Sequence, residues 1–137
     1  MAPVEVKKLI IGSLSCMILT EEKDLYSRLL FLCRLAKGNG CDMSAEDLYK
    51  LGLEYELSDL DKLRRDISDI DYKYTLLVEA FILANLSEKV SGEILSFIAD
   101  LAQIMDCDKE EIRVLGILAK SILLADPDYM LDMPVPT

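Results

Sequence analysis

Histidine is absent from this 137-residue chain, and proline occurs only four times, close to the two ends. Without histidine, neither a Ser-His nor a Cys-His catalytic pair can form. No glycine-rich phosphate-binding loop is present, because the stretch GNG at 38–40 has the character of a helix stop. Since no proline interrupts residues 4–126, an all-α chain is expected. We therefore expect a non-enzymatic helical protein without a cofactor.

Cysteine is scarce as well, and its four positions, 16, 33, 41 and 107, include no CxxC pair. Without histidine to complete a ligand set, this spacing disfavours a zinc site. Reduced cysteines and the lack of a convincing secretory signal favour a cytoplasmic protein. The apolar runs are shorter than the ~20 residues that a membrane-spanning helix needs, so no direct membrane insertion is expected.

Negative charge predominates, with 25 acidic residues against 15 basic residues and a net charge of −10. Such a surface disfavours nucleic acid and anionic membranes, whose phosphates require cations. It is compatible with a protein partner or a divalent cation. It also leaves open an acidic inhibitor that mimics nucleic acid, such as a phage-encoded antagonist. Charge alone does not decide between these alternatives.

Hydrophobic periodicity and capping residues predict seven helices. Their expected ranges are about 4–19, 24–37, 45–54, 59–68, 71–86, 92–105 and 109–125. The expected N-terminal caps are Ser44 with Asp47, Ser58 with Asp61, Asp108 with Glu111, and Ser91. The first and fifth helices are apolar on nearly every side, which is typical of helices at the centre of a bundle.

An internal repeat relates two parts of the chain at an offset of 66 residues. The matching pairs are Glu22/Glu88, Lys23/Lys89, Leu29/Leu95, Phe31/Phe97, Leu35/Leu101, Ala36/Ala102, Cys41/Cys107 and Asp42/Asp108. The repeat predicts a single domain over 1–126 with pseudo-symmetric halves at about 8–56 and 74–124. A charged linker helix at about 57–70 joins the halves, and 127–137 form a C-terminal tail or linker.

Two glycines occupy equivalent places in the repeat when the second copy is two residues shorter. Leu51-Gly52 then matches Leu115-Gly116. We expect both glycines to allow close approach of the central helices. Replacing Gly116 with leucine is therefore expected to cost much stability.

The segment EAFILANLSEKVSGEILSFIADLAQIMDCDKEEI, residues 79–112, follows a recognisable order. An apolar helix leads to Val90-Ser91 at the start of the next helix, and Asp106-Cys107 form the following turn. In this order the chain resembles the tellurite-resistance TerB-like helical domains, which also occur in membrane-anchored DnaJ-type co-chaperones. The resemblance covers residues 8–124. It implies an all-α bundle of about seven helices and a protein-binding role in a bacterial stress-response or membrane-associated assembly.

Acidic loops in some members of that family are linked to divalent-cation binding, so two loops of this chain are candidate metal sites. The candidate ligands are Glu21, Glu22 and Asp24 in the first loop and Glu88 and Glu93 in the second. A calcium site needs about six to eight oxygen ligands, whereas a lysine lies inside each loop. We expect helix–helix turns without a metal ion. A divalent-cation-binding stress or sensor protein remains the alternative, with the first loop as its better site.

An acidic stretch with neighbouring tyrosines is the candidate partner surface. Its residues are Tyr55, Asp59, Asp61, Asp66, Asp69, Tyr72 and Tyr74. Aromatic side chains beside acids suit the docking of a basic or amphipathic segment. The competing interpretation is that the tyrosines only close the edges of the core. We expect one protein partner of unknown identity, and a monomer or a weak dimer.

Overall fold

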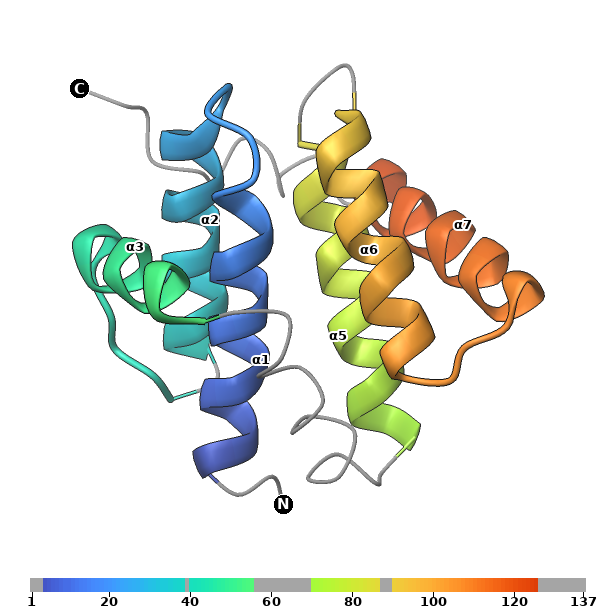
Figure 1. Ribbon diagram of the computed structural model, residues 1–137, viewed down its shortest axis with the longest axis horizontal. Helices are drawn as coiled ribbons and strands as arrows, with labels where there is room; N and C mark the ends of the chain where they lie inside the picture. Colours follow the sequence, from blue (N-terminus) through green and yellow to red (C-terminus); the bar gives the residue numbers. More distant parts are fainter. Residues whose placement is uncertain (1–3, 39, 56–69, 87–89, 126–137) are drawn as a thin grey trace.

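A computed structural model of the chain describes residues 4–38, 40–55, 70–86 and 90–125 (Figure 1). The described residues form six helices: α1 (Val4–Ile18), α2 (Leu25–Gly38), α3 (Ala45–Glu54), α5 (Ile70–Ala84), α6 (Gly92–Ile104) and α7 (Lys109–Ala125). These bounds agree closely with six of the predicted ranges. The predicted helix over 59–68 and the tail over 127–137 lie outside the described residues, as does the charged linker up to residue 69.

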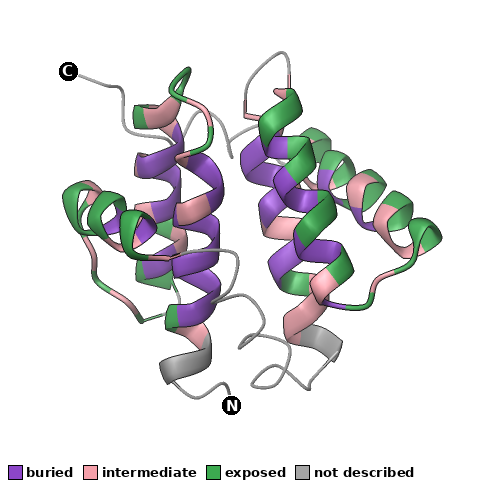
Figure 2. Ribbon diagram, in the orientation of Figure 1, coloured by how far each residue is buried: buried purple, intermediate pink, exposed green. Residues whose placement is uncertain are grey.

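The helices form two groups that meet through α1 and α5. Within the first group α1 contacts both α2 and α3, and within the second group α5 contacts both α6 and α7. Between the groups, α1 packs against α5 and α6 (Figure 1). Figure 2 shows buried residues concentrated on α1, α2, α5 and α6, with exposed residues along the outer sides of α3 and α7. The two helices predicted at the centre therefore lie there.

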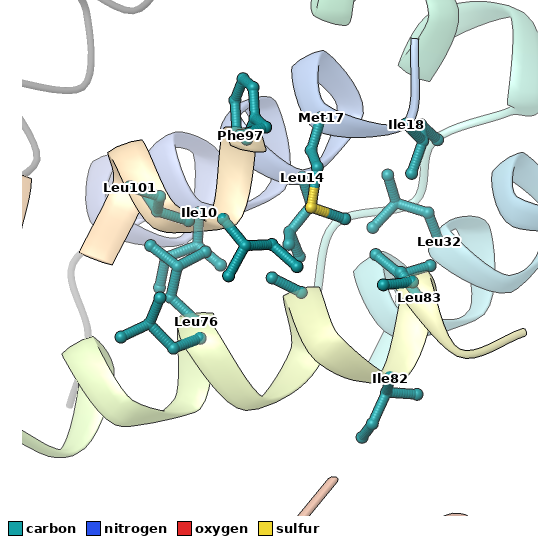
Figure 3. Packing of buried hydrophobic residues seen from close by; sticks show 14 of the residues in the cluster. Ile10, Leu14, Met17, Ile18, Leu32, Leu76, Ile82, Leu83, Phe97 and Leu101 are labelled. Carbon is teal, nitrogen blue, oxygen red and sulfur yellow. The ribbon is translucent and has the colours of Figure 1, made fainter. Parts of the chain in front are cut away.

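The core is built from aliphatic side chains that face one another across the two groups. Leu14 and Met17 of α1 are fully buried, as are Leu76 and Leu83 of α5 (Figure 3). Burying one such side chain stabilises the fold by about 1.5–3 kcal/mol. Because both central helices contribute to the same core, neither group can bury its apolar surface without the other.

Local capping signals are confirmed where the structure describes them. Ser44 and Asp47 form a capping box at the start of α3. At the start of α7, Asp108 Oδ1 accepts a hydrogen bond from the Glu111 N–H at 2.8 Å, and Glu111 Oε1 accepts one from the Asp108 N–H at 3.2 Å. Ser91 caps α6 through its hydroxyl oxygen. Each such cap contributes about 1 kcal/mol to the stability of the helix, so the helix starts are determined by local residues.

The ends of α2 and α6 have the same backbone conformation at positions 66 residues apart. Gly40 and Asp106 adopt positive φ angles of 83° and 56°. The following residues donate backbone hydrogen bonds back into the helices, from Cys41 to the Ala36 carbonyl at 2.8 Å and from Cys107 to the Ala102 carbonyl at 2.9 Å. This is the Schellman arrangement of a helix end. The sequence repeat is thus accompanied by the same helix ending.

The two glycines of the repeat have different surroundings. A Cβ atom at Gly52 would lie 2.6 Å from the Leu19 side chain and 2.9 Å from the Ser15 carbonyl group, so α3 approaches α1 too closely for a side chain. A Cβ atom at Gly116 would find nothing nearer than the Phe81 ring at 3.7 Å, which is ordinary contact. The prediction for Gly52 is confirmed. The prediction that Gly116 permits close helix packing is wrong, because an added Cβ atom makes only ordinary contact there, and the reason for expecting a large loss on replacement by leucine falls with it.

Candidate functional site

The first acidic loop, between α1 and α2, is organised around an arginine. Arg28 is fully buried, and its Nη1 donates to Glu21 Oε2 at 3.0 Å and to the Lys23 carbonyl at 3.1 Å. Glu22 and Asp24 are exposed. The carboxylate of Glu21 therefore already has a cationic partner, which competes with any role as a metal ligand.

The second acidic loop is described only in part. Glu88 lies outside the described residues, and Glu93 is exposed in the first turn of α6. Within the part of the chain that the structure describes, no three acidic, cysteine or histidine side chains are grouped to hold a metal ion. The structure does not bring the described candidate ligands together.

Arg28 is absent from the site residues that the sequence predicts, although its role is central to the packing. Its Nε donates to the carbonyl of Leu83 at 3.1 Å, in the last turn of α5. A cation near a helix C-terminus interacts favourably with the helix dipole. Two signals in the sequence point to it: Arg28 follows an acidic loop, and the repeat pairs it with Ile94, which is fully buried. Arg28 thereby connects the two groups of helices.

The tyrosines of the predicted partner surface, Tyr55, Tyr72 and Tyr74, are half-buried. Tyr55 packs its ring against Gly12 of α1, where a Cβ atom would lie 2.5 Å from the ring, and its carbonyl accepts a hydrogen bond from Cys16 Sγ at 3.4 Å. Tyr72 borders a small cleft beside α1. The four aspartates of the predicted surface, Asp59, Asp61, Asp66 and Asp69, lie outside the described residues. The partner surface therefore stays a prediction, because its four aspartates are not among the residues that the structure describes.

Tyr74 of α5 forms a hydrogen bond with a residue of α7. Its hydroxyl donates to Glu111 Oε2 at 2.5 Å, and Lys73 Nζ lies 5.5 Å from the centre of its ring. The hydrogen bond to Glu111 is the main cause that raises the pKa of Tyr74 to about 12, and it also lowers the pKa of Glu111. At neutral pH the tyrosine is therefore neutral and the glutamate is charged, which preserves the bond between α5 and α7.

Glu79 is an acidic residue within the apolar run of α5. It lines a cleft of about 80 Å³ together with Lys7, Ile10, Ile11, Tyr72 and Thr75. Burial raises the pKa of Glu79 to about 7, because the charged carboxylate loses its hydration there. The position corresponds in the repeat to Ser13, which is fully buried. Glu79 is thus a pH-dependent element of the core.

An apolar groove of about 440 Å³ lies between α7, the end of α5 and the start of α6. We call it the α7 groove. Its apolar lining includes Phe81, Ala84, Leu95, Ile112 and Ile117, and Gly116 lies beside Phe81. Leu95 and Ile117 are each about half exposed, at 47% and 52%. The groove therefore presents apolar surface to solvent instead of enclosing it.

Among the described residues that line the α7 groove, the charged ones are Arg113 and Lys120. Arg113 is held within α7 by Glu110, through Nε to Oε2 at 3.1 Å and Nη2 to Oε1 at 2.5 Å. Lys120 is exposed. In a chain of net charge −10, an apolar groove with a cationic rim is unusual.

Apolar surface continues along α7 beyond the groove. Val114, Leu118 and Leu124 are exposed, and Leu124 reaches 83% exposure. Leu124 is seven residues from Ile117, so the two lie on the same face of the helix. The opposite side of α7 is buried through Leu115 and Ala119. α7 therefore carries exposed apolar side chains in addition to those that it buries.

Comparison with known proteins gives no family. The chain matches no protein-family model, no curated protein and no solved structure. Within the residues that the structure describes, no helix combines the length and apolar character needed to cross a lipid bilayer. The chain is thus an all-helical domain without a family or homologue assignment.

Proposed function

We propose that the protein is a non-enzymatic interaction module of the TerB-like type, which acts in the cytoplasm by binding another protein. The single observation that carries the proposal is the α7 groove with its exposed apolar continuation along α7. An apolar surface of this kind is stabilised when a partner removes it from water. A bacterial stress-response or membrane-associated assembly is the setting that the TerB-like resemblance suggests.

The TerB-like architecture, with pseudo-symmetric halves, is part of the same proposal. It is supported by the order of helix, acidic turn, helix, Cys-Asp turn and helix in each half. The matched helix endings at Gly40 and Asp106 support it as well. So does the placement of α1 and α5, whose bounds are offset by 66 residues and which each contact two helices of their own group.

The non-enzymatic character is supported by the cysteines, which are the strongest nucleophiles that the sequence offers. Burial is the main cause that raises the pKa of Cys33 and of Cys107. A thiol with a raised pKa is protonated at neutral pH and is a poor nucleophile. These two side chains therefore suit packing better than covalent chemistry.

Affinity capture from bacterial lysate tests the proposal, with the full chain as bait at low and at high salt. We expect one specific protein to be retained at both salt concentrations and to be lost when the bait is Gly116→Leu. Gly38→Leu is the matched control, because an added Cβ atom at Gly38 meets nothing within 4 Å. Retention of only basic nucleic-acid-binding proteins, lost at high salt, would contradict the proposal, because screening weakens plain charge attraction.

A further inference from the structure

We infer that the α7 groove receives an amphipathic helix of the partner, with its apolar face in the groove and carboxylates along its edge. This inference rests on the proposed interaction function and specifies the chemistry of the partner. Three features support it: the dimensions of the groove, the charge at its edge and the position of Gly116 in its lining.

The dimensions suit a helix better than a small ligand. From Arg113 to Leu124, α7 presents apolar and cationic residues over about 16 Å at ~1.5 Å per residue, which corresponds to three turns of a partner helix. Helices dock in grooves through apolar anchors at positions i, i+3 or i+4 and i+7. A small ligand buries most of its surface in an enclosed pocket. Here the exposed side chains of Leu95, Ile117 and Leu124 extend the apolar surface past such a ligand.

The charged residues at the edge of the groove favour a partner helix that places negative charges beside them. Arg113, which is paired with Glu110, and Lys120 are the charged residues of the described lining, whereas the chain as a whole carries 25 acids against 15 bases. The aliphatic stems of such side chains cover apolar surface while their charged ends remain in water. A carboxylate on the partner can therefore pair with Lys120 at the edge of the groove, and a basic helix would meet like charge there.

Gly116 belongs to the lining of the groove that the helix would contact. The nearest atoms to a Cβ atom built on Gly116 belong to the Phe81 ring, at 3.7 Å, which is ordinary contact. A larger side chain at position 116 would therefore occupy part of the groove. Gly116→Leu should block docking while the fold is retained.

The test uses two fluorescein-labelled helical peptides with the same stripe of leucines, one flanked by glutamates and one by lysines. Fluorescence anisotropy with the full chain measures a Kd for each. We expect the glutamate peptide to bind at least tenfold more tightly than the lysine peptide. Long-range attraction to a chain of net charge −10 predicts the reverse order, so the comparison separates local recognition from net charge.

Variants locate the binding. We expect Gly116→Leu to raise the Kd for the glutamate peptide at least tenfold while the Tm of the protein stays unchanged. We expect Lys120→Glu to abolish the preference for the glutamate peptide over the lysine peptide. Gly38→Leu and Lys50→Glu are the matched controls outside the groove and should bind as the wild type does. Equal binding by Gly116→Leu and the wild type would overturn the inference, as would tighter binding of the lysine peptide.

Other occupants of the α7 groove would give different results, and each of these results would overturn the inference of a partner helix. Palmitate that binds in a Gly116-dependent way, without peptide binding, assigns the groove to an acyl chain. A concentration-dependent dimer in sedimentation that Gly116→Leu abolishes assigns it to a second copy of the chain. If neither peptide binds but lysate capture remains specific and sensitive to Gly116→Leu, the proposed function stands and the helix inference fails. If capture is absent or insensitive to Gly116→Leu, the groove does not carry partner binding and both fail.

Discussion

Replacing Arg28 tests how the two groups of helices are held together. Its Nε donates to the Leu83 carbonyl and its Nη1 to Glu21, and the side chain is fully buried. A hydrogen bond to a charged group contributes about 1.5–3 kcal/mol. Removing one partner of a buried ion pair typically costs about 3–5 kcal/mol, because the other charge is left uncompensated. We expect Arg28→Ala to lower the free energy of unfolding by that amount, which is a large fraction of the ~5–15 kcal/mol of a typical domain.

A double-mutant cycle in urea separates the ion pair from simple loss of packing. Arg28→Met keeps an unbranched apolar chain but leaves Glu21 without its counter-charge, and Glu21→Gln removes that charge. The double variant should lose less than the sum of the two single variants, with a coupling of about 1–2 kcal/mol. The unfolding free energy and the m-value from circular dichroism give each corner of the cycle.

An exposed ion pair on α3 supplies the control for this cycle. Lys50 and Glu46 lie 3.2 Å apart with both side chains largely exposed. Exposed pairs contribute little, so Lys50→Met should change stability by under ~0.5 kcal/mol. If Arg28→Ala stayed within ~1 kcal/mol of the wild type, or the cycle gave no coupling, the assigned role of Arg28 would be refuted.

Three further predictions concern the core and the helix starts. The raised pKa of Glu79, about 7 in the folded state, means that the folded chain binds more protons than the unfolded chain between pH ~4.5 and ~7. Stability from this group is therefore present below pH ~4.5 and is lost as the pH rises through about 7. Thermal melts of Glu79→Gln should lack this decline, and at pH 8 the free energy of unfolding of the variant should exceed that of the wild type by about 3 kcal/mol, whereas parallel pH profiles would contradict the assignment. In urea titrations, Gly52→Ala should cost about 1–3 kcal/mol because the new Cβ atom meets the Ser15 carbonyl group. Gly116→Ala should instead be neutral or stabilise by up to ~1 kcal/mol, and similar losses at both glycines would refute the difference. Ser91→Ala should cost about 1 kcal/mol in the same assay by removing the cap of α6, with Ser96→Ala as an exposed control in the same helix, and equal stability of the two variants would argue against the cap.

The helices could be predicted from the sequence because their signals are local. A capping pair such as Ser44 with Asp47 lies within one turn, and an apolar stripe requires only the helical period. The burial of α1 and α5 follows from the same patterns, because a helix without a polar face has to be covered. These features do not depend on which helices become neighbours.

The role of Arg28 could not be predicted in the same way, since it depends on a carbonyl 55 residues further along the chain. The sequence shows an arginine within an apolar stripe, but it does not show that the last turn of α5 ends beside it. The same limit applies to the metal-site candidates. Glu21 is part of an acidic loop in the sequence, and only the fold shows that its carboxylate is bonded to Arg28.

The two equivalent glycines show why the repeat predicts backbone conformation better than function. A repeated Leu-Gly pair keeps the same place in a helix, but its environment depends on what the helix crosses. At Gly52 an added Cβ atom would lie within 3 Å of the Leu19 side chain and the Ser15 carbonyl group, whereas at Gly116 it would make an ordinary contact with the Phe81 ring at 3.7 Å. Gly116 also lines the α7 groove, so the two positions have different surroundings although they are equivalent in the repeat. A function carried by that groove would belong to the second half alone, so filling position 116 should affect partner binding while the corresponding change at position 52 should affect folding.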